Sequence, residues 1–199
     1  MSASSTGKLY LDAQDLLESA FRLAAMIYDS GFRPSFVVAV WRGGAPIGIA
    51  VQEFFATHGV RTDHIAIRTR AYDVGIDSRR REIDVQGLDY LADRLTPADR
   101  VLIVDDVYDT GRSVAAIIDR LSALCRRNMP ADVRVAVPWF KPNRNETSRT
   151  PDYFLHTTES WLKFPHSLEG LSRDEIKAHR PELWAVLQPY LEPYLEPHT

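Results

Sequence analysis

Short apolar runs alternate with amphipathic stretches along most of the chain. The runs at 36–40 and 101–104 are wholly apolar, which is typical of strands buried on both faces of a parallel sheet. Further strands are predicted at 64–69, 133–137 and 152–156. Helical spacing of apolar residues separates these strands, so two strand–helix–strand units are visible. The pattern predicts an α/β fold, a parallel-sheet core with helices on both faces.

The helices are indicated by their end signals as well as by their spacing. Helices are predicted over 12–31, 46–59, 88–95 and 113–127. In the tail, Ser172 and Glu175 form a capping-box pattern, and Pro181 is suited to the first turn of a last helix. We therefore expect one domain over 1–199, with a core at about 9–157.

The stretch 70–87 interrupts this alternation. It contains two glycines and the consecutive arginines Arg79, Arg80 and Arg81. Segments of this length inside a compact domain are often lids, so we interpret it as a mobile loop or ribbon. A solvated charge run is an equal alternative for the individual arginines.

Composition limits the function classes. The 199 residues carry a formal net charge of -3, which disfavours a general nucleic-acid or membrane-surface binder. The single cysteine, Cys125, excludes an internal disulfide. No apolar run reaches transmembrane length, and we expect a cytoplasmic protein. The six histidines show no metal spacing, and His156 and His166 are interpreted as satisfied surface or core residues.

The strongest motif spans 101–113. Asp105 and Asp106 follow a buried strand, at the end where ligands bind in open α/β sheets. The loop then turns into a helix through Thr110, Gly111, Arg112 and Ser113, and free amides at a helix start suit a phosphate. Solvated turn acids and simple helix caps are the alternatives for each feature alone. No Gly-Lys-Ser/Thr sequence is present, which excludes a Walker-type loop.

A second candidate anion loop lies in the first strand–helix connection. Trp41, Arg42, Gly43 and Gly44 follow the strand at 36–40. The glycines allow close backbone approach, and Arg42 supplies a fixed positive charge. A plain tight turn is the alternative interpretation.

The thirteen residues 101–113 resemble the 5-phosphoribosyl-1-pyrophosphate (PRPP) signature of type I phosphoribosyltransferases at every position. The resemblance implies that Asp105 and Asp106 contact the ribose and Mg2+, directly or through water. It also implies that the loop Asp109–Ser113 holds the 5'-phosphate, with Asp109 as the acid or base near the purine. The 41–44 loop is similar to the family's pyrophosphate loop, which often has a cis peptide, here at Trp41–Arg42.

The resemblance extends to the lid and to the base pocket. Residues 79–81 would close over pyrophosphate, with Tyr72 at the start of the lid, although Ala71 replaces a serine common in purine enzymes. The segments 139–143 and 159–166 are similar to segments of xanthine-guanine and hypoxanthine-guanine phosphoribosyltransferases. Carried over, Lys141 donates to the purine 6-oxo oxygen, Trp161 stacks on the purine and Leu162 offers its carbonyl. A surface lysine and a core aromatic are the alternatives.

These features together imply a purine phosphoribosyltransferase that uses Mg2+ and PRPP and transfers the phosphoribosyl group to guanine, xanthine or hypoxanthine in purine salvage. A base-binding hood and helical tail are expected at about 158–199, and the family suggests a homodimer or homotetramer. No nucleic-acid or membrane partner is expected. Enzymes for uracil, orotate or adenine, and a PRPP-binding regulatory protein, are the alternatives.

Overall fold

The computed structural model describes residues 7–73 and 81–191. Its main sheet contains β2 (Phe36–Trp41), β3 (Asp63–Asp73), β4 (Arg81–Gln86), β5 (Arg100–Val104), β6 (Val107–Tyr108), β7 (Asp132–Phe140) and β8 (Tyr153–Thr157). The strand order is β4-β3-β2-β5-β7-β6, and β8 also pairs with β7. All pairs are parallel except β3 with β4.

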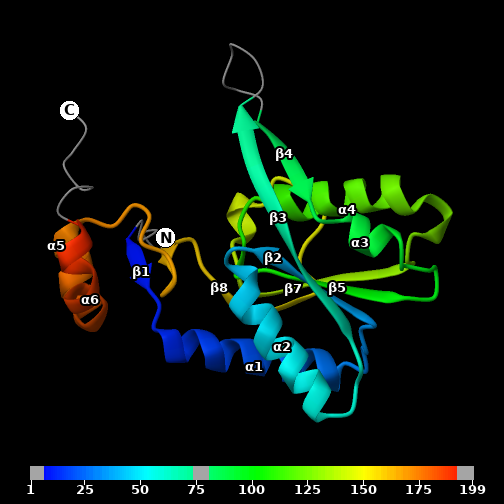
Figure 1. Ribbon diagram of the computed structural model, residues 1–199, viewed down its shortest axis with the longest axis horizontal. Helices are drawn as coiled ribbons and strands as arrows, with labels where there is room; N and C mark the ends of the chain where they lie inside the picture. The colour runs from blue at the N-terminus through cyan, green and yellow to red at the C-terminus, as the bar shows by residue number, and fades with distance from the viewer. Residues whose placement is uncertain (1–6, 74–80, 192–199) are drawn as a thin grey trace.

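Helices cover both faces of this sheet, as Figure 1 shows. One face carries α1 (Ala13–Asp29) and α2 (Gly44–Thr57), and the other carries α3 (Asp89–Ala92) and α4 (Arg112–Cys125). Short 3-10 turns follow at Arg126–Asn128 and Pro142–Arg144. The predicted fold class is confirmed. Within 7–73 and 81–191, no helix has the length and apolar character needed to cross a membrane.

The central strands are buried on both faces, as their apolar sequences predict. Alternate residues face opposite ways, so Leu102 and Val104 belong to the core under α1 and α2. Val101 and Ile103 belong to the core under α3 and α4. Full burial of each such side chain contributes roughly 1.5–3 kcal/mol, which fixes β5 at the centre of the sheet.

The stretch predicted as a lid is mostly an antiparallel ribbon. β3 and β4 pair from Arg68↔Gln86 to Asp73↔Arg81 and extend beyond the other strands. Tyr72 lies in β3 and Arg81 begins β4, whereas Arg79 and Arg80 lie outside the described residues. The interpretation as a loop was therefore wrong for 70–73 and 81–86, because pairing between the two strands satisfies the hydrogen bonds of their backbone.

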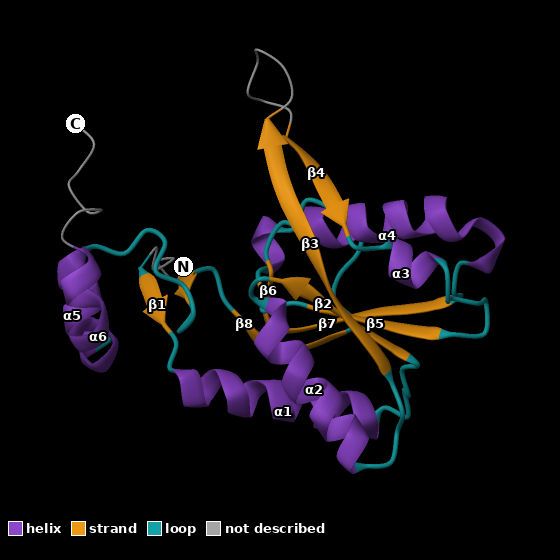
Figure 2. Ribbon diagram, viewed as in Figure 1, coloured by secondary structure: helices purple, strands orange, loops and turns teal. Residues whose placement is uncertain are grey.

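A small hood stands beside the main sheet. It consists of β1 (Lys8–Tyr10), β9 (Trp161–Lys163), α5 (Arg173–His179) and α6 (Pro181–Leu191), as Figure 2 shows. β1 pairs in parallel with β9 in register Lys8↔Trp161. The ordered chain thus includes Lys8, just before the expected core at about 9–157, because the distant strand 161–163 provides its partner. The predicted capping box at Ser172 and Glu175 is confirmed.

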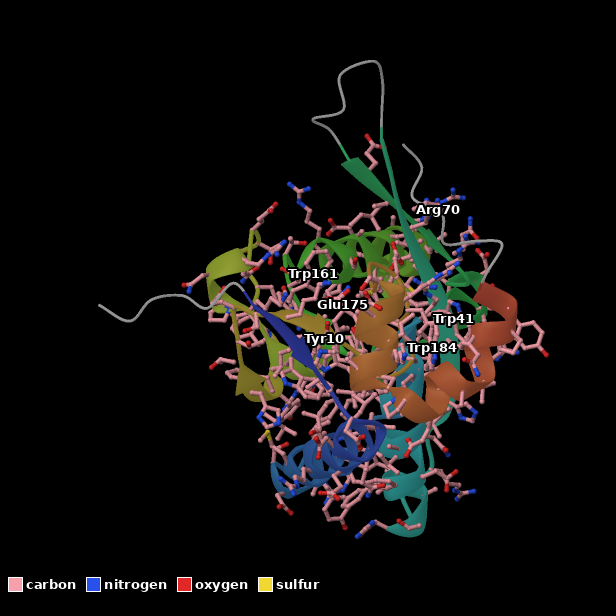
Figure 3. The ribbon with its side chains drawn as sticks, turned by 90° about the vertical axis from the view of Figure 1, so that its left-hand side faces the viewer. Tyr10, Trp41, Arg70, Trp161, Glu175 and Trp184 are labelled. Atoms are coloured by element: carbon pink, nitrogen blue, oxygen red, sulfur yellow. The ribbon has the colours of Figure 1, made fainter. Side chains whose placement is uncertain are left out.

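Glu175 connects the two ends of the chain within the hood. Its carboxylate forms an ion pair with Lys8, and it accepts a hydrogen bond from the Tyr10 hydroxyl at 2.9 Å. Figure 3 shows Tyr10 and Glu175 on this face of the molecule, together with Trp161. The hydrogen bond from Lys8, with further donors at Ser172 and Tyr10, lowers the pKa of Glu175 to about 2.

We expect Glu175→Gln to destabilise the protein in a pH-dependent way. The pKa of Glu175 in the folded protein lies below its ordinary value of 4.5, so the carboxylate stabilises the fold fully above pH 4.5. This contribution is lost as the pH falls from 4.5 towards 2. Wild-type Tm should exceed the variant's at neutral pH, and the gap should narrow over that range. Glu53→Gln, at an exposed position of α2, is the control. A gap that is independent of pH would contradict this role.

Candidate active site

One register places the phosphate loop beside the end of β7. Strand partners differ by 32 positions at Arg100↔Asp132 in β5 and again at Tyr108↔Phe140 in β6. Asp105 and Asp106 interrupt the ladder without shifting it, since both pairings have the same offset. Continued by one residue, this register brings Asp109 opposite Lys141.

Asp109 lies between two cations at this point. Lys141 Nζ is 3.4 Å from Asp109 Oδ2, and Arg144 Nε is 2.7 Å from Asp109 Oδ1. Lys141 is only 5% exposed, so its ammonium is held close to the loop rather than in solvent. A buried ammonium and a carboxylate form one donor–acceptor pair at the mouth of the loop.

Gly111 allows the tight turn into α4. Its φ is +77°, and an added Cβ would lie 2.6 Å from the Tyr108 hydroxyl and 2.7 Å from Thr147 Oγ1. Gly111 is also the N-cap of α4, so the amides that follow lie at the positive end of the helix. These amides, with the half-buried Thr110 and Ser113, can bind a phosphate.

The segment 142–149 braces this loop from outside. The Glu146 N–H donates to the Thr110 carbonyl at 3.0 Å, and Arg112 forms an ion pair with Glu146 at 2.6 Å. The Tyr108 hydroxyl donates to the Arg149 carbonyl at 2.9 Å. Arg112 is therefore engaged with Glu146, and its role at the 5'-phosphate stays a prediction.

Asp105 and Asp106 form an unneutralised acid pair. Burial, followed by the charge of Asp106, raises the pKa of Asp105 well above its ordinary value. Hydrogen bonds from the backbone amides of Asp106 and Gly44 act in the opposite direction. Two adjacent carboxylates in this position favour a bound cation or sugar hydroxyls, which would relieve the repulsion.

The 41–44 loop approaches the acid pair closely. Its Trp41–Arg42 peptide is cis, as predicted. A Cβ on Gly43 would lie 1.8 Å from Asp106 Oδ2, and one on Gly44 would lie 2.5 Å from the Val104 carbonyl oxygen. Glycine is thus required at both positions, because any side chain would displace the acid pair or the end of β5.

A cavity of about 530 Å³ lies between this loop, Asp106 and the segment that follows β9. Trp41, Arg42, Gly43 and Asp106 line one side, and Phe164, His166 and Ser167 line the other. Arg42 also forms an exposed ion pair with Glu169 at 3.2 Å. The 41–44 loop and Asp106 therefore line one cavity together with residues 164–167.

The other predicted base-pocket residues lie on the hood. Trp161 is 61% exposed on β9, with Lys163 Nζ 4.4 Å from the centre of its ring. The side chain of Leu162 is buried in the core, which leaves only its backbone for a ligand. Their roles stay predictions, as do those of Tyr72 and Arg81.

Sequence reasoning missed the hood residues that line the cavity. His166, interpreted as a satisfied histidine, has its Nε2 3.6 Å from Asp106 Oδ2. Its ring stacks on Phe164 with centroids 5.5 Å apart. Their position directly after Trp161 and Leu162 was the available signal, but only the folded hood brings them to the acid pair.

The donor set fits a weakly held hard cation. Within the described part of the chain, no group of three or more His, Cys, Asp and Glu side chains could hold a metal ion. Mg2+ commonly keeps several waters and takes one or two carboxylates plus substrate phosphates. Asp105 and Asp106 supply that number of carboxylates beside the cavity, so the residues fit Mg2+ that arrives with a phosphorylated substrate.

Comparison with known proteins identifies the family. Residues 7–175 match the phosphoribosyl transferase domain. The chain therefore belongs to the phosphoribosyl transferase family, which is a class of transferases. No curated protein matches the chain significantly.

Solved structures share this fold. A purine phosphoribosyltransferase from Pyrococcus horikoshii Ot3 has 24% identity and a TM-score of 0.63, covering 83% of this chain and 97% of that one. A hypothetical protein from Neisseria gonorrhoeae with bound ppGpp has 21% identity and a TM-score of 0.69, covering 92% and 99%. A Helicobacter pylori xanthine-guanine-hypoxanthine phosphoribosyltransferase has 18% identity and a TM-score of 0.59, covering 79% and 92%.

We expect Asp105→Asn to stabilise the protein. The folded protein raises the pKa of Asp105 above its ordinary value of 3.8, so the ionised group destabilises the fold increasingly as pH rises from 3.8. The variant's Tm should exceed the wild type's at neutral pH, by about 2–4 °C for each kcal/mol in a chain of this size. The difference should shrink towards pH 3.8. Asp119→Asn, exposed on α4, is the control. A lower Tm for Asp105→Asn at neutral pH would contradict this account.

Proposed function

We propose that the protein transfers the 5-phosphoribosyl group of PRPP to a 6-oxopurine base, giving a nucleoside monophosphate and pyrophosphate in purine salvage. The observation that carries the proposal is the placement of Lys141 Nζ 3.4 Å from Asp109 Oδ2, at the end of the phosphate loop. An ammonium donates to a 6-oxo oxygen but has no acceptor for the 6-amino group of adenine. The similar Pyrococcus protein is a purine phosphoribosyltransferase and the Helicobacter protein a xanthine-guanine-hypoxanthine phosphoribosyltransferase, which supports a purine substrate.

The reaction follows from the charges that the site offers. Breaking the bond between C1' and pyrophosphate leaves positive charge on the ribose and negative charge on the leaving group. Arg42 and the 41–44 backbone would bind that leaving group, and the loop Asp109–Ser113 would hold the 5'-phosphate. Asp105 and Asp106 would orient the ribose hydroxyls. Mg2+, when bound, supplies further charge stabilisation of the pyrophosphate.

Asp109 would act as the acid or base that exchanges a proton with the purine. N9 of the base attacks C1' from the side opposite pyrophosphate and inverts that carbon. The carboxylate of Asp109, beside Lys141 and Arg144, would hold a proton at N7. The hood and the β3–β4 ribbon would keep water from the cation-like C1'.

A second candidate is a nucleotide-binding regulatory protein. The Neisseria gonorrhoeae structure contains ppGpp, a guanine nucleotide whose base also carries a 6-oxo group. The same Lys141 and the same phosphate loop would suit such a ligand. This candidate requires tight binding of ppGpp without turnover of any base.

The function is tested with a panel of bases. Guanine, xanthine, hypoxanthine, adenine, uracil and orotate are each incubated with PRPP and Mg2+, and nucleotide and pyrophosphate are quantified. We expect turnover of at least one 6-oxopurine, rejection of adenine and loss of activity in excess EDTA. Turnover of none, with ppGpp binding by calorimetry, would instead favour the regulatory candidate.

Lys141→Met should weaken catalysis with 6-oxopurines selectively. Losing a charged hydrogen bond in a buried pocket costs roughly 1.5–3 kcal/mol, which is about a ten- to hundred-fold loss in kcat/KM. The KM for PRPP should change little, because its phosphates bind elsewhere. Lys177→Met, exposed on α5, is the matched control. Unchanged kinetics with every 6-oxopurine would remove Lys141 from base recognition.

A further inference from the structure

The hood side of the cavity is formed by the segment 163–167. This segment leads from the end of β9 into turns before α5, so no sheet or helix ladder fixes most of its backbone. Phe164, His166 and Ser167 nevertheless line the cavity opposite Asp106. Their positions therefore depend on whatever holds the backbone of this segment.

Arg180, the C-cap residue of α5, holds that backbone. Its Nη1 donates to the carbonyls of Pro165 at 3.1 Å and Ser167 at 2.9 Å. Its Nη2 donates to the carbonyls of Lys163 at 3.2 Å and Phe164 at 2.6 Å. One planar guanidinium thus connects four carbonyls in five consecutive residues, which the single ammonium of lysine cannot reproduce.

The guanidinium is itself fixed by the hood. The backbone carbonyl of Arg180 accepts from the Trp184 N–H at 2.8 Å, which joins α5 to α6. α5 is tied to β1 through Glu175, and His179 stacks on Tyr10 with ring centroids 3.7 Å apart. Helix α5 is therefore fixed to strand β1. Arg180, at the end of α5, connects this helix to the backbone of 163–167.

The bonded carbonyls lie on both sides of His166. Pro165 precedes it and Ser167 follows it, so both flanking carbonyls point to the same guanidinium. This leaves the His166 ring directed across the cavity, with Nε2 3.6 Å from Asp106 Oδ2. The Phe164 ring stacks on the His166 ring, with the two planes 12° apart, so the two side chains pack against each other.

We propose that Arg180 is a positioning residue for base binding. By holding the carbonyls of 163–167, it fixes the segment that continues directly from Trp161 and Leu162, the residues proposed to contact the base. It also places Phe164 and His166 opposite Asp106. It acts through this segment and does not touch substrate. The inference rests on the proposed function and extends it to the helical tail.

The test compares Arg180→Lys and Arg180→Met with the wild type, using the best base of the panel. Arg180→Lys should raise the KM for the base about tenfold, the effect of losing one or two hydrogen bonds of a charged donor, and Arg180→Met should raise it further. The KM for PRPP should change less than about twofold, since its loops belong to the main sheet. Arg120→Met, exposed on α4, is the control.

Assays are run well below the Tm of each variant, and Arg180→Lys, which keeps the cation, serves if Arg180→Met does not fold. An unchanged base KM in a folded variant would overturn the proposal. Equal increases in both KM values would also overturn it, because they indicate a general structural role.

Hydrogen exchange separates this proposal from the function it rests on. Amides of 160–170 should exchange faster in the variants, while those of β5 do not change. If the wild type turns over no base, the proposed function fails, and GMP is used as the probe. Protection of 160–170 by GMP in the wild type, lost in Arg180→Lys, would still support positioning, and its absence would refute it.

Discussion

Parallel pairing of β5 and β6 with β7 keeps one register across the two acidic residues that interrupt it. The offset at Val104↔Ala136 is the same as at Val107↔Trp139, so the chain leaves the sheet at Asp105 and returns in phase. Asp106 therefore lines the cavity, and the pairing with β7 continues on both sides of it. The phosphate loop, α4 and Lys141 all take their positions from that continuation.

Close approach of the 41–44 loop adds a second constraint. Gly43 and Gly44 bring backbone amides against Asp106 and the end of β5, where a side chain would not fit. Burial and the charge of Asp106 raise the pKa of Asp105 well above its ordinary value, whereas the hydrogen bond from the Gly44 amide acts in the opposite direction. An ionised Asp105 is therefore costly to the folded protein, and the cation and sugar hydroxyls proposed above would offset that cost.

The hood is held together differently, because its two strands form a separate small sheet and do not pair with the main sheet. Its two strands come from opposite ends of the chain and contribute only three residues each. Side chains supply the rest of its cohesion, through the Glu175 and Arg180 contacts. The function proposed above would assign the base to residues near this hood and PRPP to the loops of the main sheet.

The cis peptide at Trp41–Arg42 was expected only from the resemblance of the 41–44 loop to the family's loop. The amino-acid sequence itself predicted the central strands, the helices on both faces and the positions of the two loops. These features depend on local signals: apolar runs, end residues, glycines and a continuous motif at 101–113. Three features could be found only in the folded chain. They are the β3–β4 ribbon, strand β1 and the contact of His166 with Asp106. Each of these features depends on a partner that is distant in sequence, as Trp161 is from Lys8. The spacing of apolar and polar residues along the chain does not identify such a partner.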